Sequence, residues 1–226
     1  MSHNENITRI KAVHNALGDL KNKVVFVGGA TVSLYADRQA TEVRPTDDVD
    51  ILVEITSSSE FANLEQQLRE RNFKNDTTAK FAGRYTLPGI VVDVMPTDEK
   101  ILGFVNKWYK EGFQSAINYT IDEQHEVRIF TSPIFIATKL EAFKSRGNND
   151  GRTSSDFEDI VFVLENRSVI WQEMAETSGE LAMYLDQEVS ALLNNKYCAE
   201  WINANSNAYP PSSYFIMSEM KLFLKR

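Results

Sequence analysis

The spacing of apolar residues changes twice near the start of the chain. Over residues 7–20, apolar positions recur every three or four residues, which predicts a first amphipathic helix. Four consecutive apolar residues at 24–27 then predict a buried strand, residues 30–36 suit a short helix, and residues 49–55 form a second strand. The apolar positions of the first helix are Ile7, Ile10, Val13, Leu17 and Leu20.

Capping and turn residues divide the next part of the chain. Residues 57–60, Ser-Ser-Ser-Glu, offer caps for a helix over 61–71. The dipeptide Pro88-Gly89 separates a candidate strand at 81–87 from an apolar run at 90–95. A two-residue turn between two such segments predicts a β-hairpin.

Strand signals end after a last candidate strand at 127–130, and the remainder of the chain favours helices. Thr131-Ser132-Pro133 combines a cap residue with proline at a first helical position, so we place a domain boundary there. We therefore predict an α+β fold. Residues 1–130 would form an N-terminal mixed β-sheet core with flanking helices, and residues 131–226 a C-terminal helical domain. The helices expected in that domain span 132–146, 155–166, 180–193 and 213–224.

Composition narrows the classes of function only slightly. The 226 residues are 42% hydrophobic, enough for a substantial core, and 24 basic against 32 acidic residues give a net charge of −8. This balance argues against broad electrostatic binding to a nucleic acid backbone, although a local basic patch stays open. Cys198, the single cysteine, excludes an internal disulfide and a cysteine-based zinc cluster. The N-terminus lacks an apolar signal core and no apolar run is long enough to cross a bilayer, so we expect a cytoplasmic protein without membrane contacts.

Three aspartates interrupt or border the predicted strands. Asp48 and Asp50 lie two residues apart at the start of the second strand, and the strand period of two puts both on one face. Asp93 lies inside the apolar run 90–95, where a bare carboxylate is costly unless a cation or hydrogen-bond donors meet it. We interpret all three as catalytic ligands of two Mg²⁺ ions that hold a nucleoside triphosphate, with Asp93 assisting deprotonation of an acceptor hydroxyl. The alternatives are surface acids on an edge strand for the first two and a hydrogen-bonded structural acid for Asp93.

Gly28 and Gly29 follow the first predicted strand and precede the short helix. Backbone N–H groups here could receive phosphate oxygens of a nucleotide, and the missing Cβ atoms let a ligand approach closely. A simple tight turn is the alternative for this pair. Arg44, upstream of the aspartates, is a candidate to pair with a phosphate or with Asp50, and otherwise a loop arginine.

The glycine pair, the segment Arg44-Pro45-Thr46-Asp47-Asp48-Val49-Asp50 and the segment Val92-Asp93-Val94 together resemble the DNA polymerase β-like nucleotidyltransferase superfamily. Within it, the chain is most similar to the AbiEii-type nucleotidyltransferases, toxins of type IV toxin–antitoxin and phage abortive-infection systems. Segments 139–146 and 155–160 extend the resemblance, which covers about residues 22 to 165. It implies that Lys139 contacts the nucleotide phosphates. It also implies that Asp156 supports the site from the helical domain, which would close the nucleotide cleft.

The resemblance implies an enzyme that transfers a nucleoside monophosphate from an NTP to a hydroxyl acceptor, with Mg²⁺ as cofactor and pyrophosphate as the leaving group. The acceptor would be an RNA 3′ end, such as that of tRNA, or a protein side chain. A cognate antitoxin would be a partner. Two alternatives stay open: transfer to a small molecule, as in the aminoglycoside and lincosamide nucleotidyltransferases, and nucleotide binding without catalysis.

Overall fold

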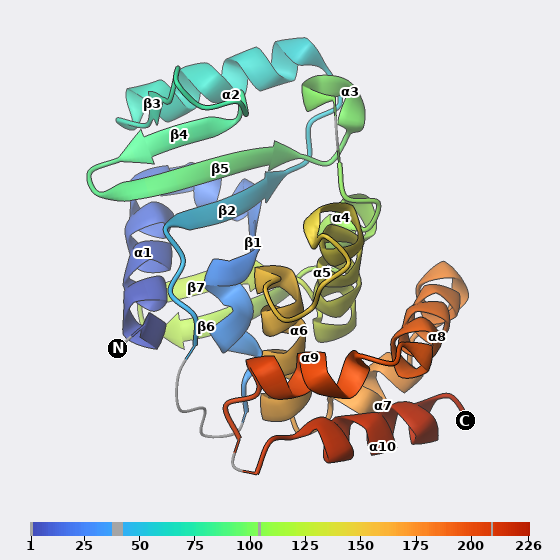
Figure 1. Ribbon diagram of the computed structural model, residues 1–226. Coiled ribbons are helices and arrows are strands. Elements are labelled where there is room, and N and C mark those ends of the chain that lie inside the picture. The colour runs from blue at the N-terminus through green and yellow to red at the C-terminus, as the bar shows by residue number, and fades with distance from the viewer. Residues whose placement is uncertain (1, 38–42, 104, 209) are drawn as a thin grey trace. The chain divides into compact units, whose positions relative to one another are not determined.

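The computed structural model describes residues 2–37, 43–103, 105–208 and 210–226. The chain divides into two compact units. The first, the sheet unit, comprises Met1–Leu34 and Arg44–Thr131; the second, the helical unit, comprises Tyr35–Val43 and Ser132–Arg226. Strands and helices together confirm the α+β fold class (Figure 1).

A mixed sheet of seven strands in the order β3-β4-β5-β2-β1-β7-β6 organises the described residues of the sheet unit (Figure 1). The pairs β2–β5 and β1–β7 are parallel, and the other neighbours are antiparallel. The strands span Val24–Val27 (β1), Asp48–Val53 (β2), Lys74–Asn75 (β3), Arg84–Leu87 (β4), Ile90–Pro96 (β5), Ile117–Asp122 (β6) and His125–Ile129 (β7). Parallel pairing needs strands that are covered on both faces, and β1 is accordingly buried along its whole length.

The expected elements of the sheet unit are present with shifted ends. The first helix, α1 (Ser2–Leu17), stops before Leu20 because Gly18 adopts a left-handed conformation with φ +54° and a 3₁₀ segment, η1 (Gly18–Lys23), follows. The short helix after β1 is also 3₁₀, η2 (Gly29–Tyr35). Ser57 caps α2 (Ser58–Glu70) by accepting the N–H of Glu60 at 3.3 Å. Two further short helices lie in the described residues of the sheet unit: α3 (Glu99–Leu102) and α4 (Tyr109–Gln114).

The hairpin and the last strand are confirmed, and two strands were not expected. Leu87 pairs with Ile90 across the turn, where Gly89 takes φ +76°. The strand expected at 127–130 is β7, which begins two residues earlier and ends one residue earlier. Its partner β6 was missed although its apolar residues Ile117, Tyr119 and Ile121 alternate with polar ones, and β3 has only two residues.

Six helices make up the described helical unit: α5 (Ser132–Arg146), α6 (Ser155–Asn166), α7 (Ile170–Ala175), α8 (Gly179–Asn194), α9 (Cys198–Asn205) and α10 (Ser213–Phe223). The rings of Phe143, Phe157 and Trp201 meet in its core, with centroids 5.1 to 5.8 Å apart. The four helices expected from the sequence correspond to α5, α6, α8 and α10. Ser154 caps α6, accepting the N–H of Phe157 at 3.3 Å.

Among the described residues, no helix combines the length and apolar character needed to span a membrane.

Candidate active site

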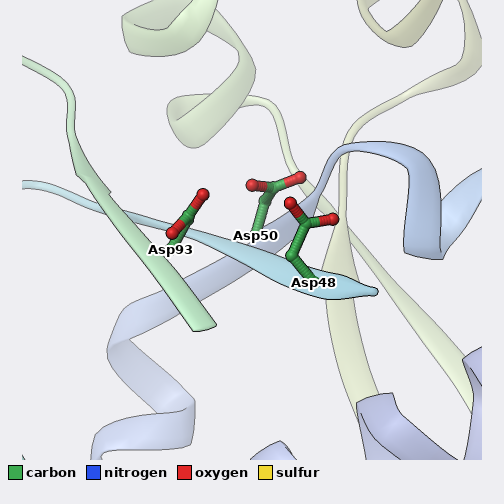
Figure 2. A group of neighbouring side chains, drawn as sticks. All are labelled: Asp48, Asp50 and Asp93. Atoms are coloured by element: carbon green, nitrogen blue, oxygen red, sulfur yellow. The ribbon is translucent and has the colours of Figure 1, made fainter. Parts of the chain in front are cut away.

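Asp48, Asp50 and Asp93, the aspartate triad, lie together on two neighbouring strands. Strands β2 and β5 run parallel with Asp50 directly opposite Asp93, and Asp48 lies two residues before Asp50 on the same face. Figure 2 shows the three carboxylates on the same side of the sheet. One oxygen of each acid lies within 4.8 Å of the others. The convergence expected from the strand period is therefore present in the sheet.

The chemistry of this donor set fits a hard divalent cation. Carboxylate oxygens are preferred by Mg²⁺, and three acids at this spacing repel one another unless positive charge is supplied. Asp93 is 8% exposed, whereas Asp48 and Asp50 are half-buried and can be reached by solvent and ligands. The three acids expected from the sequence are therefore the residues that would hold Mg²⁺.

Arg84 on β4 supplies the positive charge found at the triad. Its Nε donates to Oδ1 of Asp93 and its Nη2 to Oδ2, both at 2.7 Å, which is the two-pronged geometry of a strong arginine–carboxylate pair. Nη2 also lies 3.7 Å from Oδ2 of Asp48. The hydrogen bonds to Asp93 raise the pKa of Arg84 against the opposing effect of desolvation, and the charges of all three aspartates add to the rise. Arg84 therefore stays charged at every relevant pH.

Arg84 was not among the candidates from the sequence, although one signal could have found it. In a hairpin that turns at Pro88-Gly89, residue numbers opposite one another add to a constant. The pair Leu87–Ile90 fixes that constant and places Arg84 opposite Asp93. The predicted hairpin therefore carries the signal that pairs Arg84 with the buried Asp93.

Gly28 makes room for the Asp50 carboxylate. Val27 pairs with Asp50 across the antiparallel β1–β2 ladder, and Gly28 follows with φ +71°. A Cβ atom at Gly28 would lie 1.8 Å from Oδ2 of Asp50. The sequence interpretation gave ligand approach as the reason for the glycine. The structure supplies another: the space beside Gly28 is filled by a carboxylate of the protein itself.

Gly29 opens η2, and the turn between β1 and η2 is closed by Thr31. The N–H and the hydroxyl of Thr31 donate to the carbonyl of Gly28 at 3.3 and 2.9 Å. These bonds fix the direction in which the chain leaves the triad. Phosphate binding by the N–H groups of this turn stays a prediction.

A buried asparagine of α1 holds the loop that leads into β2. The side chain of Asn6 donates to the carbonyl of Arg44 and accepts the N–H of Thr46, both at 3.2 Å. The Thr46 hydroxyl in turn donates to the carbonyl of Asp48 at 3.1 Å. Arg44 itself donates from Nη1 to the carbonyl of Pro45 at 3.4 Å, and its expected contact with a phosphate stays a prediction.

Lys139 and Asp156, the two candidates beyond residue 131, lie in the helical unit within a buried ion network. Nζ of Lys139 is 3.1 Å from Asp156 and 2.6 Å from Asp159, and Arg146 donates to both oxygens of Asp156. Burial alone would lower the pKa of Lys139, but the charges of Asp159 and Asp156 outweigh it and raise the pKa. Asp156 is also buried, yet Arg146 and Lys139 hold its pKa below the usual value.

This network links α5 to the start of α6 and gives both residues a structural role within the helical unit. Their expected roles at the nucleotide stay predictions. Asp159 was not singled out from the sequence. Its position three residues after Asp156, one helical turn further on, was the available signal.

No protein-family model matches the sequence, and no curated protein does so either. Among solved structures, one that is similar is the solution structure of the antibiotic-resistance factor ANT(2'')-Ia. The similarity has a TM-score of 0.49 and 13% sequence identity, and it covers 84% of this chain and 96% of that chain. A likeness this distant carries no weight for activity or substrate, so we base the functional assignment on the aspartate triad.

Proposed function

We propose that the protein is a Mg²⁺-dependent nucleotidyltransferase of the DNA polymerase β-like superfamily. The observation that supports this most is the convergence of Asp48, Asp50 and Asp93 from two paired strands, with one oxygen of each within 4.8 Å of the others. Three acids held this closely are unfavourable for folding, which is typical of a site kept for binding a cation.

The residues of the sheet unit would have distinct roles. The triad would hold Mg²⁺, which supplies a Lewis acid to neutralise phosphate charge and lower the pKa of the acceptor hydroxyl. Asp93, whose two oxygens accept hydrogen bonds from Arg84, is the carboxylate we assign to assist deprotonation of that hydroxyl. Backbone N–H groups at Gly28 and Gly29 and the guanidinium of Arg44 would bind the phosphates of the NTP.

For the acceptor we propose an RNA 3′ end, such as that of tRNA, or a protein side chain, as in AbiEii-type toxins. A cognate antitoxin and a cytoplasmic location belong to the same proposal, as do the nucleotide contacts of Lys139 and Asp156. Because Lys139 is already paired with Asp156 and Asp159, a contact with phosphate would have to be made against these two carboxylates.

A cationic small molecule is the second candidate acceptor. The chain has a net charge of −8, which attracts a polycationic acceptor such as an aminoglycoside and repels a polyanion such as RNA. Nucleotide binding without turnover is the weaker third reading, since it is typical of chains that have lost a metal-binding acid and this chain retains all three.

One labelling experiment tests these proposals together. Protein is incubated with each α-labelled NTP, Mg²⁺, total cellular RNA and an aminoglycoside mixture, beside the Asp48→Ala/Asp50→Ala variant. RNA, protein and small molecules are then separated. We expect label in one fraction with the unsubstituted protein only, and that fraction identifies the acceptor. Equal label with both proteins, or NTP binding without label in any fraction, contradicts the enzymatic proposal.

A further inference from the structure

The guanidinium of Arg84 takes up both oxygens of one of the three proposed metal ligands. Nε and Nη2 each donate to a different oxygen of Asp93 at 2.7 Å, so neither oxygen is without a donor. Nη2 lies 3.7 Å from Asp48, a distance at which the charges attract. The arginine therefore acts on two acids of the triad.

A divalent cation bound by all three acids would have to share Asp93 and Asp48 with this guanidinium. Carboxylate oxygens have more than one lone-pair position, but positive charges brought together at one carboxylate repel each other. The side chain of Arg84 is 34% exposed and long, so it can turn away without disturbing the sheet.

We propose that Arg84 is the resident counter-cation of the aspartate triad and competes with divalent metal for it. In the metal-free protein, Arg84 stabilises three acids that would otherwise repel one another. Metal binding displaces the guanidinium from at least part of its contact with Asp93 and Asp48. The inference rests on the proposed metal-binding function and adds that this chain lowers its own metal affinity.

The alternative to competition is that Arg84 positions Asp93 for the metal. The two roles predict opposite effects of losing Arg84 on metal affinity. If Arg84 only orients Asp93 for the metal, its loss weakens metal binding. If it competes, its loss strengthens metal binding, because one positive charge leaves the site. The two roles are therefore distinguished by a substitution that removes the positive charge of Arg84 and one that keeps it.

The test is Mn²⁺ binding to the nucleotide-free protein, measured by electron paramagnetic resonance of unbound Mn²⁺. Arg84→Gln should bind Mn²⁺ at least about tenfold more tightly than the unsubstituted protein. Arg84→Lys, which loses the two-pronged contact but keeps the charge, should stay within about threefold. Arg69→Gln, which removes one charge from the exposed surface of α2, is the matched control and should leave the affinity unchanged.

The Asp48→Ala/Asp50→Ala variant separates this inference from the proposed function. Binding abolished by this double substitution, but not strengthened by Arg84→Gln, overturns the competition alone. No binding to the triad in any of these proteins overturns both the competition and the metal-dependent function. Weaker binding by Arg84→Gln assigns Arg84 the positioning role instead.

A second measurement follows Arg84 itself in the unsubstituted protein. In protein labelled with ¹⁵N-arginine, the Nε–H signal of Arg84 reports its hydrogen bond to Asp93, and the Arg84→Lys spectrum identifies it by absence. We expect Mg²⁺ at saturating concentration to shift this signal and speed its exchange with water. A signal that does not move when the triad is saturated overturns the proposal.

Discussion

A side chain at Gly28 and the carboxylate of Asp50 cannot occupy the same space, since a Cβ atom there would lie 1.8 Å from Oδ2 of Asp50. The φ of +71° adds a second restriction, because a left-handed conformation costs a residue with a Cβ atom about 1–2 kcal/mol. Antiparallel pairing of Val27 with Asp50 leaves little freedom for either strand to move apart. Asp50, a proposed metal ligand, can therefore take its observed position only if residue 28 is glycine.

Gly28→Ala should therefore lower both stability and metal binding. We expect a loss of more than about 2 kcal/mol in the free energy of unfolding, from backbone strain plus overlap, and weaker Mn²⁺ binding because Asp50 is pushed aside. Urea denaturation and Mn²⁺ titration measure the two effects. Gly89→Ala is the matched control, with a φ of +76° but no atom within 4 Å of the added Cβ. If both variants lose the same stability and bind Mn²⁺ equally well, the overlap with Asp50 has no consequence.

Asp50→Asn should separate function from stability. The substitution removes one of three neighbouring negative charges, so in the presence of a chelator the free energy of unfolding should rise or stay unchanged. Mn²⁺ binding and nucleotide transfer should fall together, the latter by at least about 100-fold. Asp47→Asn changes the neighbouring exposed aspartate outside the triad and should leave both properties intact. A destabilised Asp50→Asn variant that still binds Mn²⁺ would give Asp50 a structural role instead.

Asn6 is expected to set the position of Asp48 from outside the sheet. Asn6→Ala leaves the buried N–H of Thr46 without its acceptor, which should cost about 1–3 kcal/mol of unfolding free energy. The loop would then hold Asp48 less firmly, so transfer activity should fall more than nucleotide affinity. Thermal unfolding and initial rates at saturating NTP measure this, with the exposed Asn4→Ala as control. Unchanged stability in Asn6→Ala would contradict the assigned hydrogen bonds.

That Asp48, Asp50 and Asp93 lie together could be predicted from the sequence because each lies in a local pattern. Asp48 and Asp50 follow the strand period, and Asp93 stands out within an apolar run. What the sequence did not reveal depends on pairing between distant segments. The need for Gly28 comes from the β1–β2 register, and the role of Arg84 comes from the hairpin register.

The ends of elements were less predictable than their existence. Leu17 and Leu20 share a helical face in the sequence, but the left-handed turn at Gly18 ends the α-helix between them. Strand β6 alternates apolar and polar residues over Ile117–Asp122, so its period of two was a readable strand signal. Its side chains are half-buried or exposed, as expected for a strand at the edge of the sheet.

The buried ion network of the helical unit should make stability depend on acidic pH. Asp156 has a pKa held below its ordinary 3.8, so its contribution is complete above that value and is lost as the pH falls through the lower pKa of the folded state. We expect the urea midpoint of the unsubstituted protein to fall more steeply between pH 5 and about pH 2.5 than that of Asp156→Asn. Asp19→Asn, at an exposed aspartate of η1, is the control for general loss of charge.

Lys139→Met extends this test to the other side of the network. Removing the ammonium leaves Asp159 and Asp156 buried with less compensating charge, which should cost about 3–5 kcal/mol at neutral pH. Arg146 still pairs with Asp156, so adding Asp159→Asn should restore part of the stability by removing the buried charge that Lys139 left. A nucleotide-binding role for Lys139 predicts a different result: NTP affinity would fall and would not recover in the double variant. Urea denaturation and NTP titration of the same proteins therefore distinguish a structural lysine from a phosphate ligand.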